Sequence, residues 1–81
     1  MLIDLDRRIE PPVEVLRRIY GLTRAESQVA MRVLNGDGLA PIAEELSVSL
    51  TTVRTHLQRI FDKTGTHRQA ELVRLLLTLS G

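Results

Sequence analysis

Apolar residues recur along the chain with the three- to four-residue spacing of amphipathic helices. The repeats predict helices over about 12–20, 24–34, 40–46, 50–63 and 67–79. Short stretches rich in glycine, asparagine, serine and threonine separate them, as expected between helices. The pattern therefore predicts an all-α fold, a small helical bundle in which four helices follow a short N-terminal helix.

Several residues mark where the predicted helices begin and end. Thr23 and Glu26 have the spacing of a capping box, in which each side chain bonds the backbone N–H of the other residue. Thr66 and Gln69 repeat this spacing, so we expect a second capping box before the last helix. Ser49 is a favourable N-cap for the fourth helix. The predicted helix ends are marked by Gly21, by residues 35–36 and by residues 64–65.

The apolar faces of these helices are expected to share one core. That core must be aliphatic, because the chain holds one tyrosine and one phenylalanine and no tryptophan. The fifth helix is apolar on nearly every side, so two of its faces need cover. The expected core residues are Val15, Leu16, Ile19 and Tyr20; Ala25, Val29 and Val33; Ile42, Ala43 and Leu46; Leu50, Val53, Leu57, Ile60 and Phe61; and Ala70, Val73 and Leu77.

The composition excludes several classes of protein. With 81 residues, the chain has room for one domain and little room for an enclosed active site. It has no cysteine, which excludes disulfides and thiolate metal sites and is typical of the cytoplasm. Unbroken apolar runs such as residues 75–77 are far too short for a transmembrane helix, and no secretory leader is recognisable. We therefore expect a cytoplasmic protein with no cofactor, no metal and no membrane contact.

The positive charge is concentrated in one segment. Residues 49–68 hold four basic side chains and a single carboxylate, Asp62, for a net charge of +3, whereas the whole chain carries +1. A local excess of this kind favours binding to nucleic acid, although a solvated helix face gives the same pattern.

The third and fourth predicted helices are joined by a very short turn, and the fourth is amphipathic and basic. This arrangement is typical of a helix-turn-helix, with a recognition helix over about 49–63. The major groove of B-DNA is about 12 Å wide and admits one helix. The exposed face combines short side chains, which allow close approach, with hydrogen-bonding ones: Thr51, Thr52 and Thr55, and Arg54, Gln58 and Arg59. Arginine bonds a guanine edge bidentately, and glutamine does the same for adenine.

Each of these residues also has an ordinary structural interpretation. Ser49 and Thr52 cap the helix whatever else they do. An exposed glutamine such as Gln58 is usually solvated, and His56 lies near the edge of the apolar stripe, where it can pack. Arg59 has charged neighbours at three and four residues, which is common on helix surfaces.

The order of the residues carries a family resemblance. The residues concerned are Leu22, Thr23, Glu26 and Val29; Gly36; Ile42-Ala43-Glu44 and Leu46; Ser49; Thr52-Val53-Arg54-Thr55-His56-Leu57; and Ile60, Lys63, Gly65 and Ala70. In this order they resemble the LuxR-type (GerE-like) helix-turn-helix of bacterial transcription regulators, over residues 22–77. The resemblance implies a four-helix domain that binds promoter DNA sequence-specifically, usually as a dimer.

The resemblance also implies roles for individual positions. Base contacts fall on Arg54, Thr55 and Gln58. Phosphate contacts fall on Ser49, Thr51, Thr52, His56, Arg59, Lys63 and Arg68. The chain departs from the family pattern at Arg54, where lysine is frequent, at Ala30, where leucine is frequent, and at Ser47, where glycine is frequent. It also departs at residues 39–41, where the family is polar and this chain has leucine, alanine and proline.

The last helix of such domains often forms the dimer contact. We therefore expect a two-fold homodimer through its second apolar face, formed by Leu72, Leu75, Leu76 and Leu79. The alternative is that the N-terminal helix covers this face with Leu16 and Ile19.

The sequence thus predicts a DNA-binding transcription regulator, with double-stranded DNA as its partner and RNA polymerase as a further candidate. Residues 1–21 are interpreted as a linker with a short helix, and residues 22–81 as the DNA-binding domain, the output domain of a larger protein. The alternative function is a protein-interaction module that reuses the same fold. An enzyme is not expected, because two histidines without an acidic cluster supply neither a zinc site nor a catalytic triad.

Overall fold

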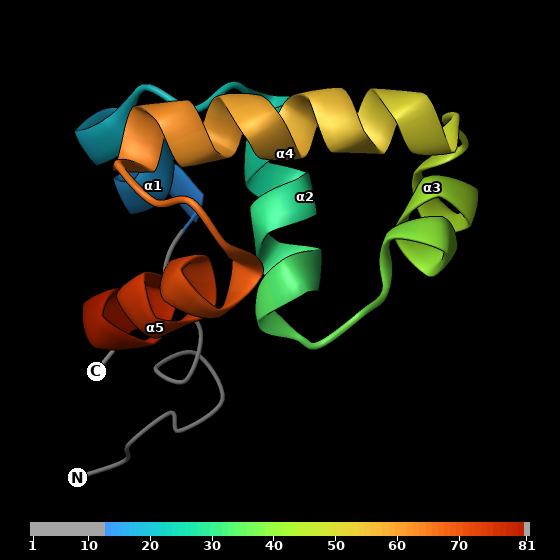
Figure 1. Ribbon diagram of the computed structural model, residues 1–81. Coiled ribbons are helices and arrows are strands. Elements are labelled where there is room, and N and C mark those ends of the chain that lie inside the picture. Colours follow the sequence, from blue (N-terminus) through green and yellow to red (C-terminus); the bar gives the residue numbers. More distant parts are fainter. Residues whose placement is uncertain (1–12, 81) are drawn as a thin grey trace, which may run out of the picture.

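Five α-helices make up the regular structure of the chain, which is described over residues 13–80 by a computed structural model. They are α1 (Val13–Tyr20), α2 (Arg24–Leu34), α3 (Leu39–Leu46), α4 (Leu50–Thr64) and α5 (Gln69–Ser80), and residues 13–80 contain no strand (Figure 1). The predicted all-α fold with a short N-terminal helix is therefore confirmed. The expected helix start at Pro12 and most of the predicted linker lie outside the described residues.

Most predicted helix ends are present and are held by the expected local contacts. The hydroxyl of Thr23 accepts a hydrogen bond from the N–H of Glu26 at 3.1 Å, and the Glu26 carboxylate accepts from the N–H of Thr23 at 3.0 Å. This reciprocal pair confirms the capping box at the start of α2. Ser49 Oγ accepts from the N–H of Thr52 at 3.0 Å, which confirms it as the N-cap of α4. Gly65, with φ 73°, ends α4 one residue later than predicted.

The second predicted capping box is absent. The hydroxyl of Thr66 pairs with that of Thr64 at 2.9 Å, and α5 begins only at Gln69. The reason lies in the end of α4, where the N–H of Thr66 donates to the carbonyl of Phe61 at 3.1 Å and keeps this residue in the closing turn. The carboxylate of Glu71 instead accepts from the N–H of His67 at 2.7 Å, a hydrogen bond that lowers the pKa of Glu71.

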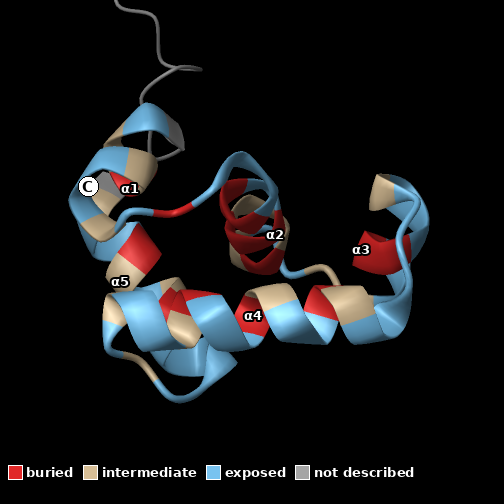
Figure 2. Cartoon of the chain, turned by 90° about the horizontal axis from the view of Figure 1, so that it is seen from above, coloured by how far each residue is buried: buried red, intermediate tan, exposed pale blue. Residues whose placement is uncertain are grey.

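The core forms where α2 meets the other helices. α4 lies across α2, α3 packs against α4, and both α1 and α5 pack on α2 (Figures 1 and 2). The side chains of Leu16, Val29, Val53 and Ile60 are fully buried, so one core joins α1, α2 and α4. Burial of Leu16 makes α1 part of the same packed body. No helix within residues 13–80 has both the length and the apolar character needed to cross a membrane.

Two core predictions on α2 and α4 are wrong. Ala25 is exposed, and its neighbours Glu26 and Ser27 are buried instead. Val29 and Val33 are buried as predicted, but in the first turn of α2 the buried side carries Glu26, which meets a lysine of α4. Leu50 is 37% exposed, since it starts α4 at the tip of the molecule beyond the reach of α2.

The orientation of α5 also differs from the prediction. Leu72 and Leu76 are fully buried in the core, whereas Ala70 is exposed and Leu77 is 55% exposed. The assignment of Leu72 and Leu76 to a dimer surface is therefore wrong, because the chain itself covers them. A helix with leucines on most sides offers several core faces of similar hydrophobicity, and its packing on α2 selects one.

Two leucines of the expected dimer face remain partly accessible. Leu75 and Leu79 are half-buried, and Leu79 packs against the core. Of the two α1 residues in the alternative cover, Leu16 is fully buried in the same core as Leu72 and Leu76, whereas Ile19 is 55% exposed.

Candidate nucleic-acid interface

Three residues, 47–49, join α3 to α4 and set the angle between them. The N–H of Ser47 donates to the carbonyl of Glu44 at 3.2 Å, and the N–H of Val48 donates to that of Ala43 at 3.0 Å. This pair of hydrogen bonds is a Schellman ending, which needs a left-handed residue at its centre. Ser47 supplies it with φ 59° and ψ 43°, and within residues 13–80 it is the one non-glycine residue with positive φ. The predicted helix-turn-helix is thus present despite the serine.

The face of α4 that points away from the core carries the predicted base-reading residues. Arg54, Thr55 and Gln58 are all exposed, while Val53 and Leu57 on the other side are buried. Figure 2 shows buried, intermediate and exposed segments alternating along α4, as expected for a helix with one side in the core. The amphipathic division predicted for this helix is therefore correct at these positions.

The start of α4 presents a cluster of hydroxyl groups. Ser49 is exposed, and its Oγ lies 2.9 Å from the Oγ1 of the half-buried Thr52, in addition to capping the Thr52 N–H. Thr51 is exposed beside them. The capping role of Ser49 is thus certain from geometry, and Thr51 is left facing solvent.

Three arginines on or next to α4 are exposed and form no salt bridge with another described residue. Within residues 13–80, no ion pair involves Arg54, Arg59 or Arg68, and all three are exposed. Arg54 and Arg59 therefore need not break an ion pair before they reach a phosphate or a base edge, whereas Arg68 interacts electrostatically with Glu71. Arg68 lies in the turn before α5, close in sequence to the end of α4.

His56 is half-buried rather than fully exposed. Its Nδ1 is buried and has no hydrogen-bond partner within the described residues. The packed orientation that the sequence left open for this side chain is therefore partly realised.

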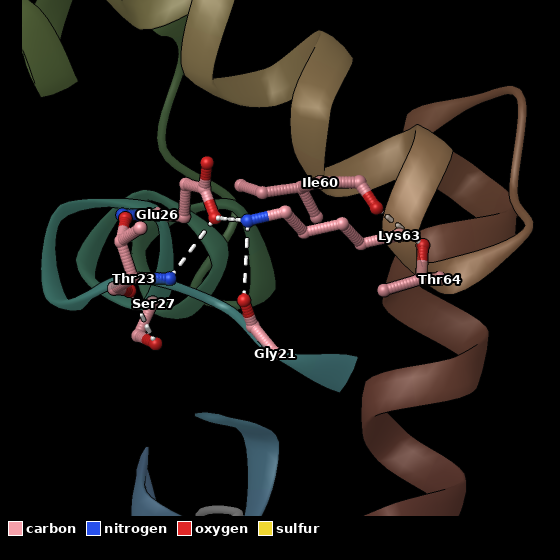
Figure 3. Close-up of polar contacts among 7 residues, drawn as sticks. All are labelled: Gly21, Thr23, Glu26, Ser27, Ile60, Lys63 and Thr64. Carbon is pink, nitrogen blue, oxygen red and sulfur yellow. Dashed lines mark hydrogen bonds and ion pairs between the residues drawn. The ribbon is translucent and has the colours of Figure 1, made fainter. Parts of the chain in front are cut away.

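Lys63, one of the predicted phosphate contacts, also makes contacts within the protein. Its ammonium group donates to Glu26 Oε1 at 2.7 Å and to the carbonyl of Gly21 at 3.1 Å (Figure 3). These bonds tie the end of α4 to the start of α2. The charge of Lys63 is thus paired with a buried carboxylate while the residue itself stays exposed, and its phosphate contact remains a prediction. Sequence offers no local sign of this pair, whose residues are 37 positions apart.

The environment of Glu26 keeps it ionised although its side chain is only 2% exposed. Burial raises the pKa of the carboxyl, but the hydrogen bond from Lys63, the N–H of Thr23 and the positive charge of Lys63 together lower it below the ordinary value of 4.5. The pair therefore remains a charged contact at neutral pH.

Gln58 makes a contact that the sequence analysis did not anticipate. Its Nε2 donates to Asp62 Oδ1 at 3.2 Å, one helical turn further along α4. Both residues are exposed on the face that carries Arg54 and Thr55. The i, i+4 spacing of an amide and a carboxylate is a sequence pattern from which this bond could have been predicted.

Comparison with known protein families supports this description of α3 and α4. No solved structure matches the chain. Residues 20–76 match the family described as bacterial regulatory proteins, luxR family. The match includes the whole of α2, α3 and α4 and most of α5. Because it spans well over half of the chain, the protein belongs to the luxR family of bacterial regulatory proteins.

Proposed function

We propose that the chain binds promoter DNA in a sequence-specific way, with α4 in the major groove. The observation that carries this proposal is the exposed set Arg54, Thr55 and Gln58, on a helix whose opposite side is anchored in the core. A rigid helix with short and hydrogen-bonding side chains on its outer face is what direct reading of base edges requires.

The proposed roles follow from the chemistry of each side chain. Arg54 bonds the O6 and N7 atoms of a guanine, and Gln58 bonds the N6 and N7 atoms of an adenine. The smaller Thr55, between them, contacts a base edge or a thymine methyl group at close range.

The proposed phosphate contacts flank this face. They are Ser49, Thr51, Thr52, His56, Arg59, Lys63 and Arg68. The hydroxyl groups lie at the N-terminus of α4, where unpaired N–H groups and the helix dipole favour an anion. Arg59 and Arg68 supply charge without base specificity.

We propose that the domain acts as the output domain of a larger regulator in the cytoplasm and pairs with a second copy through α5. RNA polymerase is a further proposed partner. The proposed division places the DNA-binding domain at residues 22–81, with α1 packed onto it through Leu16. The competing function, a protein-interaction module, does not explain why Arg54 and Arg59 are exposed and without ion-pair partners in the described part of the chain.

The test is binding to duplexes selected from a random pool, measured across salt concentration. We expect log affinity to fall linearly with log salt, with a slope of about −0.9 for each neutralised phosphate. Arg54→Ala should weaken binding to the selected site by about 1–3 kcal/mol and relax the preference at one base pair.

Arg59→Ala is the matched control, because it removes the same side chain from the same helix. It should weaken binding to all duplexes alike and reduce the salt slope by about 1. Equal binding of the selected site by wild type and Arg54→Ala would remove Arg54 from base reading. A slope near zero would reject DNA binding.

A further inference from the structure

Gln58 and Asp62 form a hydrogen-bonded pair on the proposed DNA-reading face. We propose that Asp62 is a positioning residue for base recognition: its carboxylate holds the Gln58 amide in the orientation that reads adenine. This inference rests on the proposed function of α4.

The chemistry of the two groups determines which end of the amide faces Asp62. An ionised carboxylate only accepts hydrogen bonds, whereas an amide has a donating nitrogen and an accepting oxygen. The 3.2 Å contact must therefore use the amide nitrogen of Gln58, as Nε2 to Oδ1. A rotated amide would place its oxygen against the carboxylate, and like partial charges would repel.

The remaining groups of the amide match one base edge. Nε2 carries two hydrogens, and one of them is used by Asp62, so one donor remains. Oε1 has no partner within residues 13–80 and remains an acceptor. One donor and one acceptor side by side complement N7 and N6 of adenine in the major groove.

Preorganisation is the physical benefit of the pair. A free glutamine side chain samples several rotamers and has to be ordered when DNA binds, which lowers affinity for the correct base. Asp62 orders it beforehand through a neighbour on the same helix. The same carboxylate repels phosphates, so we expect it to lower affinity for every duplex while it raises the preference for one base pair.

The experiment measures this preference directly. The probes are the duplex that wild type selects from a random pool and its single base-pair variants. Gln58→Ala identifies the base pair that Gln58 reads. Asp62→Ala should then reduce the discrimination at that base pair about 2- to 10-fold, the range expected for ordering one side chain, and leave the other base pairs unchanged. Its affinity for all duplexes should rise.

Asp62→Asn is the matched control, because it removes the same charge but keeps a hydrogen-bonding group. We expect it to raise general affinity as Asp62→Ala does and to keep part of the discrimination, because its amide still bonds Gln58 but can also donate to Oε1 and so permits the rotated orientation. In a Gln58→Ala background, Asp62→Ala should change general affinity only, since the coupling between the two residues is then absent. Both sites are exposed, and circular dichroism checks that each variant is folded.

Three results would overturn the inference. One is an Asp62→Ala protein that discriminates at the Gln58 base pair as well as wild type does. Another is an equal loss of discrimination in Asp62→Asn and Asp62→Ala, which would assign the effect to the charge of Asp62. If Gln58→Ala itself changes no base preference, the proposed reading role of Gln58 fails together with the inference. If Gln58→Ala does change a preference and Asp62→Ala does not, the proposed function stands and only the role of Asp62 is lost.

Discussion

Ser47 holds a backbone conformation that glycine adopts more readily. Gly21, Gly36 and Gly65 follow α1, α2 and α4 with positive φ, and Ser47 follows α3 with φ 59°. A side chain at such a position costs about 1 kcal/mol or more, because Cβ approaches the following carbonyl oxygen. The serine thus stores strain in the turn that orients the recognition helix.

Replacing Ser47 with glycine should therefore stabilise the domain. Relief of the left-handed strain is partly offset by the greater freedom of glycine in the unfolded chain, so we expect a gain of about 0.5–1 kcal/mol. The free energy of unfolding is measured by urea denaturation. Ser47→Ala keeps the strain and should show no such gain. A Ser47→Gly chain less stable than wild type would contradict this explanation.

At the scale of elements, one ion pair joins two helices that are distant in sequence. Lys63 at the end of α4 contacts Glu26 in the first turn of α2, and Glu26 also completes the capping box with Thr23 (Figure 3). A buried carboxylate is tolerated only when its charge is compensated and its oxygens are hydrogen-bonded. The pair therefore joins the end of α4 to the start of α2, in addition to the apolar core that the two helices share.

This contact predicts a dependence of stability on pH. The pKa of Glu26 is lowered on folding, so its stabilising contribution is present above its ordinary pKa of 4.5 and is lost as pH falls through the lower folded value. At pH 7, Glu26→Gln should be less stable than wild type by about 1–3 kcal/mol, less than for a fully buried pair because Lys63 is partly exposed. The difference should shrink as the pH falls below 4.5.

Glu45→Gln is the control for this series. Glu45 pairs with Arg32 between α3 and α2, but both side chains are at least one-third exposed. Loss of such a pair should change the free energy of unfolding by no more than about 1 kcal/mol at pH 7. Chemical denaturation of the three proteins between pH 3 and 7 measures both effects. If the difference in the free energy of unfolding between wild type and Glu26→Gln grew as the pH fell, it would contradict this explanation.

At the scale of the whole molecule, the proposed homodimer places its contact on α5. Leu75 and Leu79 are half-buried and lie one turn apart, so they share a side of the helix. Leu77 is 55% exposed and lies about 200° around the helix from Leu75. We therefore propose that the dimer contact uses the side of α5 with Leu75 and Leu79. Variants at Leu75 and at Leu77 test the two sides of the helix separately.

Leu75→Glu should weaken self-association about tenfold or more, because a charge would be buried in the interface. Leu77→Glu places the same charge on the other side of α5 and should leave association unchanged. Sedimentation equilibrium measures the dimer constant of each protein, and circular dichroism confirms folding. If wild type stays monomeric at high concentration, the homodimer proposal fails for this chain. If only Leu77→Glu weakens association, the interface lies on the opposite side.

Features that depend on neighbours in sequence were predictable from the sequence. The capping box of Thr23 and Glu26 and the outer face of α4 with Arg54 and Gln58 follow from contacts and periodicity within one helix. These are local properties, because residues three and four apart on a helix meet whatever the rest of the fold does.

The tertiary structure decided what local pattern leaves undetermined. α5 has several apolar sides, and only packing on α2 places Leu72 and Leu76 inward and leaves Leu77 outside. The pairing of Lys63 with Glu26 requires α4 to cross α2, so no spacing along the chain reveals it. The sequence pattern therefore determined the helices and the outward face of α4. The packing of the helices determined the core side of α5 and the partner of Lys63, because burial and long-range charge pairing exist only after folding.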